Sequence, residues 1–289
     1  MHQMSKASYW PALANLVQTE KSMGHWAEQK GPFTHFLYEF VRFGVKQAWA
    51  CLFAGLLLGL LILTFMFYPK DAVIARYDFL VLSAILIQVF MILFGLETKE
   101  EAKVIFFFYI VGTVMEIFKT AKGSWIYPEP SILRIGGVPL FTGFMYASVG
   151  SFMARVSRLF DFEFTHHPKT SWLVILSLLI YANFFMHHYI YDMRYFLFVG
   201  SVIVLGRCTI YYRIWKVHRH MPLLLSSFLA ALFIWFAENI GTFTAAWVYP
   251  NQKKAWEMVS FGKLGSWFLL MIISYTLVVL VQKPTERKV

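Results

Sequence analysis

Two acidic residues recur in the same aromatic setting and are the first candidates for chemistry. The segment EIFKTAKGSWIYP begins at Glu116, and ENIGTFTAAWVYP begins at Glu238, 122 positions later, with Glu, Thr, Trp, Tyr and Pro coinciding. Each glutamate ends a strongly apolar segment, where a lone carboxylate costs a few kcal/mol. If the two copies meet, desolvation and mutual repulsion favour a protonated carboxyl, as a general acid or proton carrier requires. The alternative is that each glutamate has a structural role and joins the end of its helix to the loop that follows.

The residues that follow each glutamate could bind a ligand. Thr120 and Thr242 lie four residues on, on the same helical face, where a hydroxyl can bond the carboxyl or cap the helix end. The aromatic rings are typical of a membrane interface, and they could also wall a site for a hydrophobic or cationic ligand. The candidate ligand-binding residues are Thr120, Trp125, Tyr127, Asn183, Asn239, Thr242, Trp247 and Tyr249.

His187 and His188 are further candidates for acid/base chemistry or proton transfer. They break the symmetry of the repeat, because their approximate counterparts are Phe67 and Tyr68. Adjacent side chains point to different faces of a helix, so one metal ion cannot easily take both. The HxxxH and HxxHH spacings of membrane di-iron oxygenases do not occur, so we predict no metal site, and the sequence names no cofactor.

Composition predicts the elements that must position these residues. The chain has 289 residues, of which 58% are hydrophobic, 19% aromatic and 15% charged, too few polar residues to cover a soluble globule. A bilayer-spanning helix needs about 20 mostly apolar residues. We expect an all-α polytopic membrane protein with about eight transmembrane helices, at 47–68, 79–96, 104–118, 135–154, 171–191, 195–212, 221–240 and 264–282.

The repeat extends beyond the acidic corners. The segments TFMFYPKDAVIARYDFLVL and NFFMHHYIYDMRYFLFVG share Phe-Met, Asp and Arg-Tyr in the same order. A unit with an even number of spans keeps its orientation when it is duplicated, so we predict two parallel four-helix repeats. Within a transmembrane domain at 47–282, the first repeat takes residues 47–155 and the second takes residues 171–282.

Basic residues predict the orientation. Most Lys and Arg beside the spans fall on one side when the N-terminus starts inside, so both termini are expected in the cytoplasm. The N-terminal segment 1–46 includes the sequence FTHFLYEFVRFGVK, with charged and aromatic stripes on opposite faces. It is predicted as a helix lying on the inner leaflet, or alternatively as an extension of the first span. Residues 283–289 are predicted to form a cytoplasmic tail.

The formal charge of +10 suits attraction to anionic lipid heads, and no long basic stripe points to nucleic acid. Lys263, at the start of the last span, is expected to contact phosphate or to extend to the interface rather than to form a retinal-type Schiff base. Cys51 and Cys208 make no pair motif and are predicted to be buried small residues.

Two long motifs carry a resemblance to a known family. At TVMEIFKTAKGSWIYPEPSILRIGGVPLFTGFMYASVGSFMAR and FIWFAENIGTFTAAWVYPNQKKAWEMVSFGKLGSWFLLMIISY the chain resembles the bacterial integral membrane proteins called domain of unknown function 817. The resemblance covers nearly everything from residue 43 to the last span. It implies a multi-pass protein of the bacterial inner membrane and brings no established activity.

A shorter similarity links the first corner to carotenoid-biosynthesis membrane proteins of the bisanhydrobacterioruberin hydratase type. Those proteins carry a Glu, a Gly-rich turn with aromatic-x-Tyr, and then Gly-Val-Pro. Glu116, Gly123, Trp125, Tyr127 and Gly137-Val138-Pro139 follow that order, whereas the second repeat has no Gly-Val-Pro. The resemblance implies isoprenoid chemistry.

Three functions follow from these residues. The first is a transporter whose paired glutamates serve as proton or cation sites. The second is a membrane enzyme that uses glutamate acid/base chemistry on a lipid-soluble, isoprenoid-like substrate. The third is a structural membrane protein, which explains the aromatic residues but not the repeated acids. Membrane lipids and a hydrophobic small molecule are the expected partners; the sequence does not specify the oligomeric state.

Overall fold

The computed structural model describes residues 11–287, so residues 1–10 of the predicted N-terminal segment and residues 288–289 of the predicted tail lie outside the described residues. Most of the described chain is helical. Its ten α-helices are α1 Pro11–Lys30, α2 Pro32–Ala50, α3 Leu52–Phe67, α4 Arg76–Leu93, α5 Lys99–Ala121, α6 Phe141–Leu159, α7 Thr170–Met186, α8 Arg194–Leu205, α9 Leu223–Phe243 and α10 Phe261–Val281.

Four of these helices, α4, α5, α9 and α10, are long and apolar enough to cross a membrane. The pair α2 and α3 would count as a fifth span, and its two helices are bent by 70° at Cys51. The helices α7 and α8 are apolar but shorter, with 17 and 12 residues. A helix rises about 1.5 Å per residue, so α8 covers only about 18 Å.

Small sheets accompany the helices, so the expectation of an all-α chain was incomplete. The predicted span 135–154 begins as a hairpin, in which β1 Arg134–Ile135 pairs with β2 Val138–Pro139, and α6 starts only at Phe141. Gly136 and Gly137 turn this hairpin with φ of 58° and 82°. Two successive residues with positive φ suit a tight hairpin turn and cannot continue a helix.

The predicted span 195–212 is also wrong at its end. Helix α8 stops at Leu205, and the residues TIYYR form β4 Thr209–Arg213. β-branched and aromatic residues favour a strand over a helix. Strand β4 joins β5 His218–Pro222, β3 Glu163–Thr165 and β6 Thr285–Glu286 in a four-stranded sheet of order β5-β4-β3-β6.

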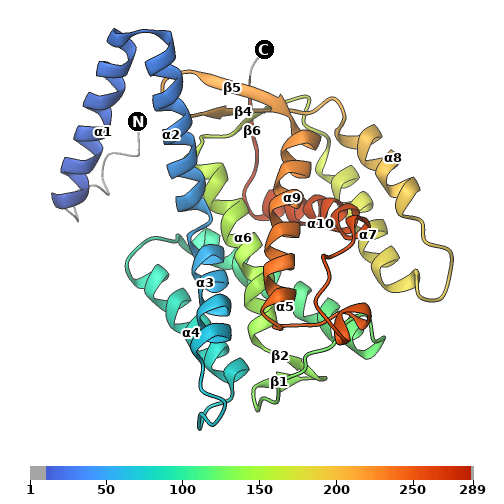
Figure 1. The fold of residues 1–289 in the computed structure, drawn as a ribbon. Helices are drawn as coiled ribbons and strands as arrows, with labels where there is room; N and C mark the ends of the chain where they lie inside the picture. Colours follow the sequence, from blue (N-terminus) through green and yellow to red (C-terminus); the bar gives the residue numbers. More distant parts are fainter. Residues whose placement is uncertain (1–10, 288–289) are drawn as a thin grey trace.

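The sheet and the acidic corners lie at opposite ends of the helices (Figure 1). The small hairpin β1–β2 and the turn after α9 mark the corner end, and β4 and β5 mark the other. Helix α6 packs between α5 and α3, whereas α10 packs against α9 and α7. The corner-end core contains buried residues from α3, α4, α9 and both corners, among them Leu61, Tyr77, Trp125, Trp235 and Trp247.

Helix α2 turns its charged stripe toward the protein. Glu39 is 6% exposed and pairs with Arg219 of β5 at 2.6 Å. The Lys46 ammonium donates to the carbonyl oxygens of Leu159 and Arg213 at 2.9 and 2.8 Å. The opposite face exposes Phe33, Phe36, Phe40, Val41 and Val45. That face suits contact with lipid chains, and the position of α2 on the inner leaflet stays a prediction.

Candidate functional site

The Glu116 carboxylate lies in a cage of aromatic donors. Glu116 is 4% exposed in the next-to-last turn of α5. It accepts hydrogen bonds from Trp125 Nε1 at 2.8 Å, from the Tyr146 hydroxyl at 2.7 Å and from the Tyr127 hydroxyl. An indole N–H can only donate, so the carboxylate oxygen must be the acceptor. Three neutral donors thus replace the water that a buried carboxylate loses.

Glu238 has the equivalent cage in the second corner. It is 4% exposed on α9 and accepts from the Tyr249 hydroxyl and from Trp267 Nε1, the latter at 2.6 Å. Tyr146 on α6 and Trp267 on α10 hold corresponding places, and their rings lie 6.4 Å apart. The sequence signal for both residues was weak, because they lie outside the repeated thirteen-residue segments.

The same helix-ending turn leads into both cages. After α5, Ser124 N donates to the Lys119 carbonyl at 3.0 Å and Gly123 adopts φ of 69°. After α9, Ala246 N donates to the Gly241 carbonyl at 3.0 Å and Ala245 adopts φ of 52°. This is the left-handed C-terminal turn that glycine favours. It folds each chain back so that its Trp and Tyr return toward the helix that carries the glutamate.

The two corners contact each other directly. Ile126 and Val248 form an isolated antiparallel bridge, with N–H to carbonyl distances of 3.0 and 2.9 Å. Beside it the Trp125 and Tyr249 rings meet edge to face, with centroids 6.0 Å apart. The Glu116 and Glu238 cages therefore belong to one connected cluster through these rings.

Lys263 of α10 lies at the junction of the two cages. Its ammonium lies 5.0 Å from the centroid of the Trp125 ring and 4.5 Å from that of the Tyr249 ring, in cation–π geometry. No hydrogen bond or ion pair joins this ammonium to another of the described residues. The sequence analysis assigned Lys263 to phosphate contact or to the interface, and its place between the two cages was not predicted.

The two adjacent histidines converge on one atom, contrary to the expectation that they point apart. Nε2 of His187 and Nε2 of His188 lie 3.3 and 3.2 Å from the Lys119 ammonium. Helix α7 ends at Met186, so the histidines lie in the turn that follows it, and their tilted rings have centroids 4.1 Å apart. Nδ1 of His187 lies 2.9 Å from the Asn183 carbonyl. That contact assigns the proton to Nδ1, which leaves Nε2 to accept from Lys119.

Burial lowers the pKa of His187 below its ordinary value of 6.5, and the Lys119 ammonium lowers it further. The pKa of His188 is lowered by the same two causes. Both imidazoles are therefore neutral near pH 7. Within residues 11–287, no group of three or more His, Cys, Asp or Glu side chains is arranged to hold a metal ion.

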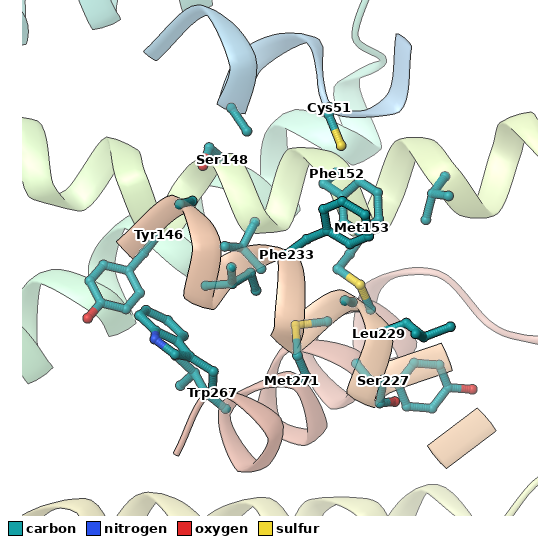
Figure 2. A pocket seen from close by; sticks show the side chains of 18 of the residues that line it. Cys51, Tyr146, Ser148, Phe152, Met153, Ser227, Leu229, Phe233, Trp267 and Met271 are labelled. Atoms are coloured by element: carbon teal, nitrogen blue, oxygen red, sulfur yellow. The ribbon is translucent and has the colours of Figure 1, made fainter. Parts of the chain in front are cut away.

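One cavity collects most of the candidate residues. Its volume is about 1120 Å³, and it extends along α10 from Lys263 to Lys283. A helix of 21 residues is about 30 Å long. Figure 2 shows Tyr146 and Trp267 on one side of the cavity and Phe152, Met153 and Leu229 on the other. The predicted site residues that line it are Glu116, Trp125, Tyr127, Asn183, His187, Glu238, Trp247 and Tyr249.

Four predicted site residues stay outside the cavity lining: Thr120, His188, Asn239 and Thr242. The Thr242 hydroxyl donates to the Asn239 carbonyl at 3.2 Å rather than to Glu238. Thr120 Oγ1 is buried without a hydrogen-bond partner among the described residues. Among the described residues neither threonine bonds its glutamate, and the Thr242 hydroxyl bonds a carbonyl near the end of its own helix instead.

The two candidate amides tie loops to helices. Asn239 donates to the Trp235 carbonyl at 2.8 Å and accepts from Val259 N at 2.9 Å. Asn183 donates to Asp192 at 3.0 Å and accepts from Met193 N at 2.9 Å. These bonds use the amide groups structurally, although Asn183 also lines the cavity.

Comparison with known proteins places the chain in a family. The family model described as "Protein of unknown function (DUF817)" matches residues 39–275. The chain is 41% identical over 249 residues to a protein of Bacillus subtilis (strain 168) named "Uncharacterized protein YoaT", which covers 86% of this chain and 94% of that protein. No solved structure matches. The chain therefore belongs to the DUF817 family, as its long corner motifs had indicated.

Proposed function

We propose that this protein is a membrane enzyme that acts on an elongated, lipid-soluble, isoprenoid-like molecule, with Glu116 and Glu238 as its acid and base. The observation that carries the proposal is the cavity of about 1120 Å³, which both glutamates line at one end. Ligand pockets for small molecules are usually about 300–1000 Å³. Phe152, Met153 and Met271 line its further length, which suits a long apolar ligand.

The corner can move protons on a carbon–carbon double bond. A glutamic acid adds its proton to one carbon of the bond, and the positive charge then lies on the neighbouring carbon. The faces of Tyr146 and Trp267, which line the cavity beside the two glutamates, stabilise that charge. The second glutamate removes a proton from the next carbon, so the double bond shifts without any change in composition.

The histidine pair supplies protons to this end of the cavity. His188 is exposed, and its Nε2 contacts Lys119, which with His187 lines the cavity. Neutral imidazoles on either side of an ammonium can exchange protons with it. The pair occurs in the second proposed repeat only. The two halves are therefore unequal near the glutamates, as an enzyme with one acid and one base requires.

We further propose that residues 47–155 and 171–282 are parallel repeats in a bacterial inner membrane, with about eight membrane-embedded helices and cytoplasmic termini. Three features support the duplication: the paired helix-ending turns, the antiparallel bridge at Ile126 and Val248, and the start of α4 and α8 at Arg76 and Arg194. The short helices α7 and α8 would then be partial spans.

A transporter is the second candidate. The cavity follows the whole length of α10, and two glutamates lie at the contact between the proposed repeats. Such an arrangement suits a proton or cation path. The glutamates, however, accept from neutral Trp and Tyr donors and have no ion pair among the described residues, so they are already satisfied without a cation.

The test compares lipids and ion flux in the same cells. Glu116→Gln and Glu238→Gln are expressed in cells that lack the chain, with the exposed Glu100→Gln as control. We expect the wild type and Glu100→Gln to change the lipid extract and each corner variant to fail. Lost proton flux with an unchanged lipid profile would favour the transporter. If folded corner variants gave the same lipid extract and the same proton flux as the wild type, only a structural role would remain for the two glutamates.

A further inference from the structure

The charges at the corner end of the cavity are segregated. Within residues 11–287, Glu116 and Glu238 accept hydrogen bonds only from neutral Trp and Tyr groups. Lys119 and Lys263 also line the cavity, and neither forms an ion pair with any of the described residues. Two ammonium groups therefore face an apolar cavity without an anionic partner in contact, although two carboxylates are buried close by.

Both ammonium groups keep donors to spare. An ammonium carries three N–H donors. Lys119 uses two of them on His187 and His188, and Lys263 uses none in a hydrogen bond within the described residues. The aromatic faces of Trp125 and Tyr249 attract the Lys263 charge but accept no conventional hydrogen bond. Unused N–H groups beside a low-dielectric cavity favour a bound anion strongly.

A third cation reinforces the site. Arg194, the first residue of α8, lines the cavity and contacts the Gly262 carbonyl at 3.4 Å, next to Lys263. Its charge is shared with Asp192 at 2.7 Å. A cationic ligand at this end would meet Lys119, Lys263 and Arg194 together, and the aromatic faces that could hold it are already occupied by Lys263.

We infer that the corner end of the cavity binds an anionic head group of phosphate type, held by Lys263 and Lys119, on a ligand whose apolar chain lies along α10. The inference rests on the proposed lipid-soluble substrate and adds its polar end. Lysine acts on phosphate as a point charge with rotatable donors, so it needs no fixed bidentate geometry. The head group would place the first carbons of the chain beside the two glutamates.

Binding of three small probes tests this assignment. Octyl phosphate, 1-octanol and inorganic phosphate are titrated into the protein in nanodiscs of a neutral phospholipid, and heat is measured. We expect octyl phosphate to bind at least about tenfold more tightly than either other probe, a difference of about 1.4 kcal/mol, because hydrogen bonds between charged groups are the stronger ones. Equal binding of octyl phosphate and octanol overturns the inference, and equal binding of inorganic phosphate overturns its lipid character.

Variants assign the preference to the two lysines. Lys263→Met and Lys119→Met should lose the preference for octyl phosphate and keep the affinity for octanol, and Lys263→Arg should keep both. The exposed Lys254→Met serves as control. A preference that survives in both methionine variants contradicts the assignment. The comparison of probes on the wild type still decides if a variant fails to fold.

The outcome separates this inference from the proposed function. Glu116→Gln and Glu238→Gln should bind octyl phosphate, because neither glutamate is assigned to the head group. If the wild type converted lipid but showed no preference for octyl phosphate, only the inference about the head group would be refuted. A preserved preference together with corner variants that convert lipid as the wild type does would refute the proposed enzyme alone.

Discussion

At the residue scale, the donors around each glutamate decide what the carboxyl can do. A buried carboxylate without partners costs several kcal/mol, and hydrogen bonds from hydroxyl and indole groups offset that cost without introducing a cation. In the part of the chain that the structure describes, Glu116 has three such donors and Glu238 has two. The pair therefore differs in how firmly each is held, which suits different acid and base roles.

Removal of one donor should destabilise the protein measurably. Tyr146→Phe leaves the ring in place and removes the hydroxyl that donates to Glu116 at 2.7 Å. We expect a loss of about 1–3 kcal/mol, the usual effect of leaving a buried polar group without its partner. Thermal unfolding in detergent measures it, with the exposed Tyr191→Phe as control. Equal stability of the two variants would contradict the cage.

The histidine pair should make stability depend on pH. The pKa of His187 in the folded protein lies below 6.5 because of burial, so the unfolded chain takes up the proton more readily. The stabilising contribution is present above about pH 6.5 and is lost as the pH falls through the folded-state pKa. Melting temperatures from pH 8 to 5 should fall more steeply for the wild type than for the double variant His187→Gln/His188→Gln. Parallel curves would contradict this.

Residue types near the repeated motif were predictable, and their partners were not. The sequence singled out Glu116, Trp125 and Tyr127 because they recur at fixed spacing. Tyr146 and Trp267 come from the helices that follow each corner. The spacing of Trp125 and Tyr127 within the motif does not indicate how close α6 packs to α5. The convergence of His187 and His188 on Lys119 depends on where α7 ends, and a boundary is the least certain part of a helix prediction.

At the element scale, the turns that end α5 and α9 have the same backbone geometry but different residues at the position with positive φ. Gly123 and Ala245 hold equivalent positions with positive φ, which is free for glycine and strained for alanine. The Cβ that alanine would add at Gly123 meets no atom within 4 Å, so backbone strain alone would set its effect.

Exchange of these two residues should shift stability in opposite directions. Gly123→Ala should cost about 1 kcal/mol, because the left-handed conformation costs about 1–2 kcal/mol and the lower entropy of the unfolded chain offsets part of it. Ala245→Gly should stabilise by up to about the same amount. Thermal melts of both variants check the signs. Stabilisation by Gly123→Ala would show that this turn is not formed.

Helices were easier to predict than the connections between them. Each of the eight apolar segments contains a helix, because a long apolar run leaves few alternatives. The errors fell where turn chemistry competes with hydropathy: at the glycine pair Gly136-Gly137 and at the strand-forming residues 209–213. The 70° bend between α2 and α3 could not be predicted, because neither proline nor glycine stands at the break at Cys51.

At the scale of the whole molecule, the contact between the two corners bears on the proposed orientation of the repeats. Because Ile126 and Val248 are hydrogen-bonded to each other, both corners lie at the same end of the molecule, as the proposed parallel repeats require. The sheet and the N-terminal helices lie at the opposite end. The positive charge of the chain is predicted to lie at that end, in the cytoplasm.

Cysteine labelling should place the two ends. In a chain with Cys51→Ala and Cys208→Ala, a single cysteine is introduced at Lys122, Lys253, Lys103 or Lys216, all of which are exposed. A membrane-impermeant maleimide added to intact spheroplasts should label the first two positions and reach the other two only after lysis. Labelling of positions 122 and 253 from opposite sides would contradict parallel repeats.

The central claim is that Glu116 and Glu238 act together on one ligand in one cavity. Its most direct test is a double-mutant cycle with Glu116→Gln, Glu238→Gln and the double variant. The quantity measured is the lipid conversion that occurs in cells with the wild type and not in cells without the chain. Groups that act as one unit are strongly non-additive. We predict that the double variant is no worse than the poorer single variant. Independent, multiplying losses, or full conversion by the folded double variant, would contradict the shared site.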